Sequence, residues 1–155
     1  MPPAWSCRVP DVIDALVDRF RTSAEFDGVT VWDGPEVSKA TPQEVLTVAY
    51  TGDENDNDVE STSLPEGLAS QPDRETFTVR CAIAVLKGNT GMRAVRRRAY
   101  ELYSAAGMIL ASDPRLGGTV LRARLGSHTF RHVQTDRGAQ ALLVFGIDCD
   151  AYTRR

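Results

Sequence analysis

The strongest constraint on the fold is the stretch ETFTVRCAIAVLKG, which begins at Glu75 and is apolar at every second position. A period of two predicts a β-strand that buries one face. After a GNTG break, apolar residues recur at helical spacing and predict a long helix that ends at Asp113–Pro114. Asn89 or Thr90 is expected to cap this helix. The predicted buried positions are Phe77, Val79, Cys81, Ile83 and Val85 in the strand, and Met92, Val95, Ala99, Leu102, Ala106 and Ile109 in the helix.

Weaker patterns on both sides of this unit complete the predicted fold. A first helix is expected over residues 9–20, and strands are expected over 29–32, 44–52 and 139–152 and in the segment after Gly118, with an edge strand around Val59–Leu64. There are too few helices for a doubly wound parallel sheet. We therefore expect an α+β fold, with an antiparallel or mixed β-sheet that carries the N-terminal helix and the longer helix on one face. The chain should form a single domain over residues 1–155, in which 53–75 is an acidic and largely loop segment.

Composition narrows the classes of protein. The chain of 155 residues is 42% hydrophobic and 25% charged, which is typical of a globular domain. No apolar run approaches the roughly 20 residues that a membrane helix needs, and the first residues lack a signal-peptide pattern. We therefore expect a cytoplasmic protein with no membrane partner. Cys81 and Cys149 lie in apolar alternating runs and are expected to be buried thiols, whereas the pattern says nothing about Cys7.

The net charge of −3 hides an asymmetry along the chain. Residues 1–86 carry 6 basic and 16 acidic side chains, and residues 87–155 carry 12 basic and 5 acidic ones. Separated charge can orient a protein against copies of itself or against an acidic partner. Alternatively, the two halves interleave in one fold, so that the surface mixes both signs.

The stretch GDENDNDVEST, from Gly52 to Thr62, resembles a calcium loop at first sight. However, a calcium loop that begins at Asp53 would need glycine at its sixth position and glutamate at its twelfth, where this chain has Asp58 and Leu64. We therefore expect no metal and no cofactor here. The loop is instead a candidate contact surface, through Asp53, Glu54, Asp56 and Asp58.

A search for catalytic motifs finds none. The chain has no Walker phosphate-binding loop, no dinucleotide-binding glycine motif, no nucleophile elbow and no HExxH zinc motif. His128 and His132 fall in a predicted strand, where positions four apart lie about 13 Å from each other and cannot share a metal. These observations favour a non-enzymatic interaction protein with no catalytic residues.

Arginines on the long helix form a second candidate surface. The pattern places Arg93, Arg96, Arg97 and Arg98 opposite the apolar stripe, on the exposed side. Such a face could be solvated, could contact another protein, or could contact nucleic-acid phosphates. Tyr100 and Tyr103 alone do not make a base-stacking platform.

From Val45 to Tyr152 the chain resembles the tail-terminator proteins of long-tailed bacteriophages, particularly those of actinobacterial hosts. The similarity rests on the strand ETFTVRC, the GNT turn, a long helix that ends in DPRLGGTV, and the closing strand TDRGAQALLVFGIDCDA. VAYTGD followed by an acidic gap also fits the family.

The resemblance implies a structural virion protein with an α+β fold. Six copies would form a ring on the head-proximal end of the tail tube, stop tube polymerisation and join the head-completion (stopper) protein. Viral DNA would pass through the pore, and assembly would take place in the host cytoplasm. A ring built from one chain needs contacts between different patches, and acidic loops facing arginine surfaces could supply them. The alternatives are another head–tail joining or neck protein, or a small nucleic-acid-binding module that uses the Arg93–Arg98 helix.

Overall fold

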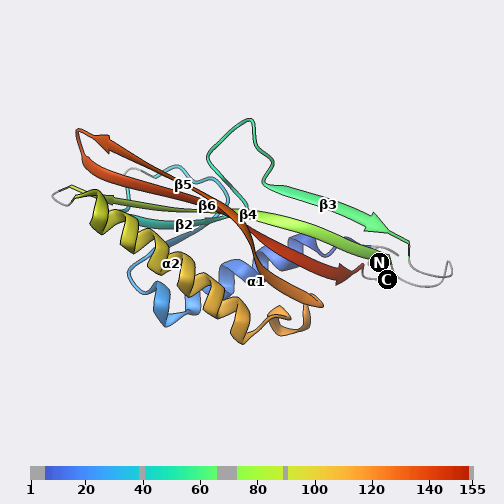
Figure 1. The fold of residues 1–155 in the computed structure, drawn as a ribbon. Coiled ribbons are helices and arrows are strands. Elements are labelled where there is room, and N and C mark those ends of the chain that lie inside the picture. The colour runs from blue at the N-terminus through green and yellow to red at the C-terminus, as the bar shows by residue number, and fades with distance from the viewer. Residues whose placement is uncertain (1–5, 39–40, 66–72, 89–90, 154–155) are drawn as a thin grey trace.

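The computed structural model of the protein describes residues 6–38, 41–65, 73–88 and 91–153. The fold is α+β: a six-stranded mixed sheet carries both α-helices on one face (Figure 1). The helices are α1 (Val9–Thr22) and α2 (Met92–Ser112). The strands are β1 (Thr30–Asp33), β2 (Glu44–Val48), β3 (Val59–Leu64), β4 (Arg74–Lys87), β5 (Arg122–Thr135) and β6 (Gly138–Tyr152). Short 3₁₀ turns lie at Ala24–Phe26 and Leu116–Gly118.

The long strand β4 organises the sheet. The strands lie in the order β1-β2-β4-β6-β5, and β3 also pairs with β4. β1 pairs with β2 in parallel, and the other pairs are antiparallel. On the side away from β6, β4 pairs with β2 from Cys81 onward and with β3 up to Val79. β3 and β5 therefore lie at opposite edges of the sheet.

The predicted buried faces of the two central strands are confirmed. The alternating residues of β4 from Phe77 to Val85, and those of β6 from Ala141 to Cys149, form one core with α1 and α2. Burying each large apolar side chain contributes about 1.5–3 kcal/mol. In α2 the predicted stripe is buried except Met92, which is half-buried, and Leu110 joins it.

Several predicted boundaries were wrong. β2 ends at Val48, not at Gly52, because Ala49 adopts a left-handed φ of 59° that interrupts the extended backbone. The strand expected after Gly118 begins only at Arg122, and Leu121 before it is exposed. A register shift between Leu125 and His128 bends that strand. The residue at the N-cap of α2 is Gly91, which has no side chain to cap with. Asn89 and Thr90 lie outside the described residues.

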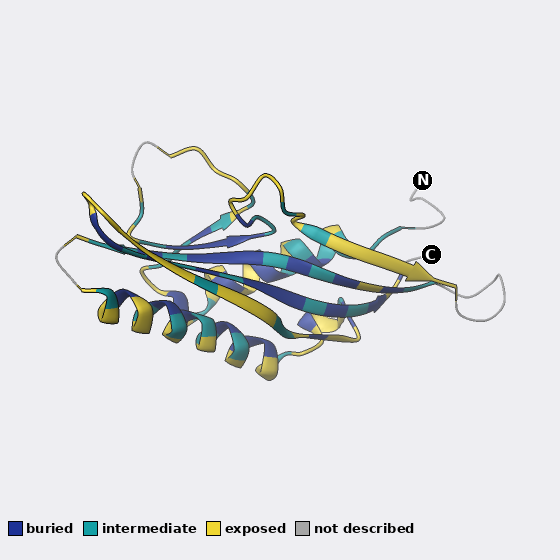
Figure 2. Ribbon diagram, turned by 45° about the horizontal axis from the view of Figure 1, so that its top comes forward, coloured by how far each residue is buried: buried dark blue, intermediate teal, exposed yellow. Residues whose placement is uncertain are grey.

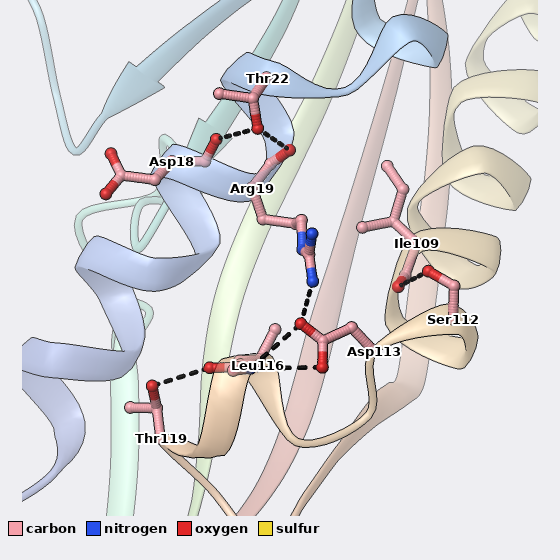
Figure 3. Close-up of polar contacts among 9 residues, drawn as sticks. Asp18, Arg19, Thr22, Ile109, Ser112, Asp113, Leu116 and Thr119 are labelled. Atoms are coloured by element: carbon pink, nitrogen blue, oxygen red, sulfur yellow. Dashed lines mark hydrogen bonds and ion pairs between the residues drawn. The ribbon is translucent and has the colours of Figure 1, made fainter.

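The end of α2 is fixed by Asp113, as Figure 3 shows. Its carboxylate forms an ion pair with Arg19 of α1 and accepts the Gly117 N–H at 3.1 Å. Leu116 and the two following glycines all have positive φ, which explains the sequence LGG at this turn. Asp113 thus ties the turn after α2 to α1. Within the described residues, no helix has the length and apolarity needed to span a membrane.

Candidate functional site

The acidic loop between β2 and β3 is anchored on Arg80. The backbone N–H of Arg80 donates to Asp58 O at 2.9 Å, and its carbonyl accepts the Tyr50 N–H at 3.1 Å. Its guanidinium lies 3.2 Å from an Asp56 carboxylate oxygen and 3.7 Å from Glu60 Oε1. One residue of β4 therefore holds both ends of the loop and one of its acidic side chains. The sequence analysis did not identify Arg80 as a functional residue. The available signal was its position in β4, where it lies between buried Val79 and Cys81 and therefore points to the helix-free face.

The loop is ordered by its own short-range hydrogen bonds. Asp53 Oδ1 accepts the Asn55 N–H at 2.9 Å, and Asp53 O accepts the Asp56 N–H at 3.1 Å. Asp56 Oδ1 accepts the Asn57 N–H at 3.0 Å. These asparagine and aspartate side chains make local turns that need no ion. Among the described residues, no group of three or more His, Cys, Asp or Glu side chains could hold a metal.

Two grooves open on the helix-free face of the sheet. One, of about 780 Å³, lies between loop residues 51–56 and β5 residues 129–131, above Leu142 and Val144. The second, of about 200 Å³, is mainly apolar and is bounded by Trp32 and Tyr50. Both grooves are lined by Thr51, Gly52 and Leu142, so both adjoin the acidic loop. The acidic loop therefore lies on the face of the sheet opposite α1 and α2 (Figure 2).

The predicted exposure of the α2 arginines is observed for three residues and is wrong for Arg98. Arg93, Arg96 and Arg97 are exposed. Arg98 instead points to β2, where its Nε and Nη2 donate to the two Glu44 oxygens at 2.6 and 3.1 Å. The hydrogen bond to Glu44 raises the pKa of Arg98. Periodicity alone does not separate Arg98 from Arg96 and Arg97, because Arg98 lies at the border of the apolar stripe, next to buried Ala99.

Aromatic residues that are distant in sequence gather between α2 and β5. Tyr100 Oη lies 3.0 Å from His128 Nε2, and the Tyr103 ring lies 4.7 Å from the His128 ring. The Phe130 ring contacts both Tyr100 and His132, at 5.3 and 5.7 Å. Both histidines are exposed, and each is part of this ring cluster. The cluster attaches the arginine-bearing helix to the β5 edge.

The far end of the helix-free face carries paired charges. Arg74 Nη2 lies 2.9 Å from Asp150 Oδ2, and Thr78 donates to Asp148 at 2.7 Å. The Arg74 hydrogen bond, with the nearby Arg124 charge, lowers the pKa of Asp150. Thr78, Asp148 and Asp150 line an open polar groove of about 440 Å³ together with Arg122 and Arg124.

The two cysteines that were expected to be buried thiols are buried. Cys81 and Cys149 are buried, and burial raises the pKa of each thiol to about 12. Cys7 is half-buried, and burial and a hydrogen bond to Glu75 raise its pKa. Glu75 is itself fully buried, and its Oε2 accepts the Arg8 N–H at 2.9 Å, at the start of α1. A carboxylate at this position stabilises the positive end of the helix dipole.

The structure keeps the two predicted surfaces apart. Asp53, Glu54 and Asp58 are exposed on the loop, and Asp56 is partly covered by Arg80. The exposed arginines lie on α2, on the other face of the sheet. Within one chain, therefore, the acidic and basic surfaces do not neutralise each other. No protein-family model matches the chain, and no curated protein matches it either.

Proposed function

We propose that the protein is a structural virion protein, a tail terminator that assembles as a six-membered ring on the head-proximal end of a phage tail tube. Its partners would be copies of itself, the tail tube protein and the head-completion protein, with viral DNA passing through the pore. The site of action is then the head–tail interface of the virion. The sequence resemblance described above is the starting point of this proposal.

The observation that carries the proposal is the separation of charge within one fold. The acidic loop and the exposed α2 arginines lie on opposite faces of the sheet, whereas Arg80 and the β5 arginines share the face of the loop. A molecule with two different, complementary patches can bind a copy of itself head to tail, and such contacts close into a ring when the rotation fits. The α+β fold also agrees with what the resemblance implies.

A nucleic-acid-binding module is the second candidate, because the Arg93, Arg96 and Arg97 face adjoins the ring cluster of Tyr100 and its neighbours. Those rings pack against one another rather than standing free, which disfavours base stacking on them. A different head–tail joining protein would share the proposed location but not the capping of the tube.

Mass measurement and DNA titration of the purified protein separate these functions. The proposal expects ring-shaped particles, or rings that add to the ends of tail tubes, with weak DNA binding. A monomer that binds DNA with a steep decline in affinity as salt rises would replace it with the nucleic-acid module.

A further inference from the structure

The backbone is strained at Ala49, where β2 meets the acidic loop. Its φ of 59° lies in the left-handed region, which glycine adopts readily and alanine does not. The register of β2 would place Ala49 opposite Arg80, yet the N–H that donates to the Arg80 carbonyl, at 3.1 Å, is that of Tyr50. One extra residue is therefore inserted at the end of β2, as in a β-bulge whose first residue is normally glycine.

The inserted residue reverses the alternation of β2. Thr47 lines the apolar groove on the helix-free face, and Val48 belongs to the core. In a regular strand, Ala49 would face the groove and Tyr50 would face the core. Instead, Ala49 packs against the core and Tyr50 lines the groove together with Trp32. The strained residue thus places Tyr50 in the wall of this groove.

β2 and β3 share one edge of β4 and meet at Arg80 (Figure 1). If the register of β2 continued without the bulge, Tyr50 would lie opposite Val79 of β4. That place is now taken by Val59 of β3, which is half-buried and packs against the same core. Extension of β2 and pairing of the start of β3 are therefore mutually exclusive.

The observed arrangement is weakly held at this junction. The left-handed backbone of Ala49 is unfavourable, and the buried Nε of Arg80 has no hydrogen-bond partner among the described residues. β3 offsets little of this, because its residues after Val59 are exposed, and segments with few buried contacts open most readily. The sequence pattern also predicts an extended strand up to Gly52, so the local preference conflicts with the observed turn.

We infer that β2 and β3 form a switch at this edge of β4, with Ala49 as its hinge. In the switched state Ala49 is extended, β2 continues beside β4 past Arg80, and the start of β3 is released. Tyr50 then leaves the groove for the core side, where it takes the place of Val59. The acidic loop loses the hydrogen bond from the Arg80 N–H to Asp58 O. Tyr50 and the loop thus act as a gate on the groove, within a single chain and without ring assembly.

Two substitutions of Ala49 test the switch in opposite directions. Ala49→Gly removes the backbone strain and favours the observed state, whereas Ala49→Val favours the switched state, because a β-branched residue is strongly disfavoured at positive φ. Amide hydrogen exchange is followed by mass spectrometry in residues 59–61 and 50–51. Residues 59–61 should exchange about fivefold more slowly in the glycine variant and at least about tenfold faster in the valine variant. Residues 50–51 should exchange no faster in the valine variant, since they gain β4 as a partner.

Ala94, at an exposed position of α2, is the matched control. Glycine and valine both lower helix propensity there, so both variants should be destabilised without any change of exchange in residues 59–61. Circular dichroism confirms that each variant is folded, and the glycine variant tests the switch even where the valine variant does not fold.

Two results would overturn the inference. In the first, the Ala49 variants leave exchange in residues 59–61 unchanged or shift it in the same direction. In the second, Ala49→Val accelerates exchange in residues 50–51 as much as in residues 59–61, which would mean that the junction frays and β2 does not extend.

Discussion

Replacing Arg80 with methionine should loosen the acidic loop while leaving the core intact. The substitution removes two ion pairs from a guanidinium that is about one-third exposed, at 3.2 Å to Asp56 and 3.7 Å to Glu60. Each such pair contributes about 0.2–1 kcal/mol. In the wild type, the buried Nε of Arg80 has no hydrogen-bond partner among the described residues. The cost of burying it offsets part of the stabilisation by the two ion pairs. A net loss of about 1 kcal/mol lowers the melting temperature of a chain of this size by about 2–4 °C.

Hydrogen exchange locates the effect. The Asn55 and Asp56 amides, which are hydrogen-bonded inside the loop, should exchange about fivefold faster in the variant, whereas the β4 amides should not change. Arg115→Met, at an exposed position outside the loop, is the matched control and should leave both regions unchanged. Unaltered exchange in the loop would refute a role of the Arg80 side chain in ordering the loop, even if the melting temperature fell.

Three further predictions concern the sheet. Gly138→Ala should destabilise the protein by about 2 kcal/mol or more in urea unfolding, because φ is 115° and an added Cβ would lie 2.5 Å from a carbonyl at the end of β4. Arg98→Ala should lower the free energy of unfolding by about 2 kcal/mol, because it leaves the largely buried Glu44 carboxylate unpaired. Arg96→Ala should cost almost nothing, because Arg96 is exposed. Equal effects of the two variants would contradict the pairing of Arg98 with Glu44. Arg74 lowers the pKa of Asp150 below its ordinary value of 3.8. The ion pair therefore contributes fully to stability above pH 3.8, and this contribution is lost as the pH falls through the lowered pKa of Asp150 in the folded protein. Arg74→Met should therefore lose stability relative to the wild type at neutral pH but converge with it in acid.

The elements with strong periodicity could be predicted from the sequence. The alternation in β4 and the apolar stripe of α2 determine which faces are buried, because burial of those side chains dominates the energetics. The edge strand Val59–Leu64 was also predicted at its observed bounds. Most residues of β3 are exposed, so a pattern of buried positions does not mark this strand.

The partners of charged side chains could not be predicted. Arg98 and Arg96 look alike in the sequence, yet Arg98 meets Glu44 across 54 positions of chain. Arg80 anchors the loop because β4 changes its neighbouring strand from β2 to β3 at that residue. The alternation of apolar residues in β4 does not show which strands will pair with it. The buried Glu75 likewise depends on where the start of α1 lies against β4.

The central proposal, that this chain forms a ring that terminates a phage tail, is tested most directly by electron microscopy and mass measurement of the purified protein, alone and mixed with phage tail tubes. The account predicts a closed ring of six 17.0 kDa chains, with one ring at one end of each tube and no further tube growth at that end. A protein that stays unassembled in both samples, with tube ends that continue to grow, would contradict it.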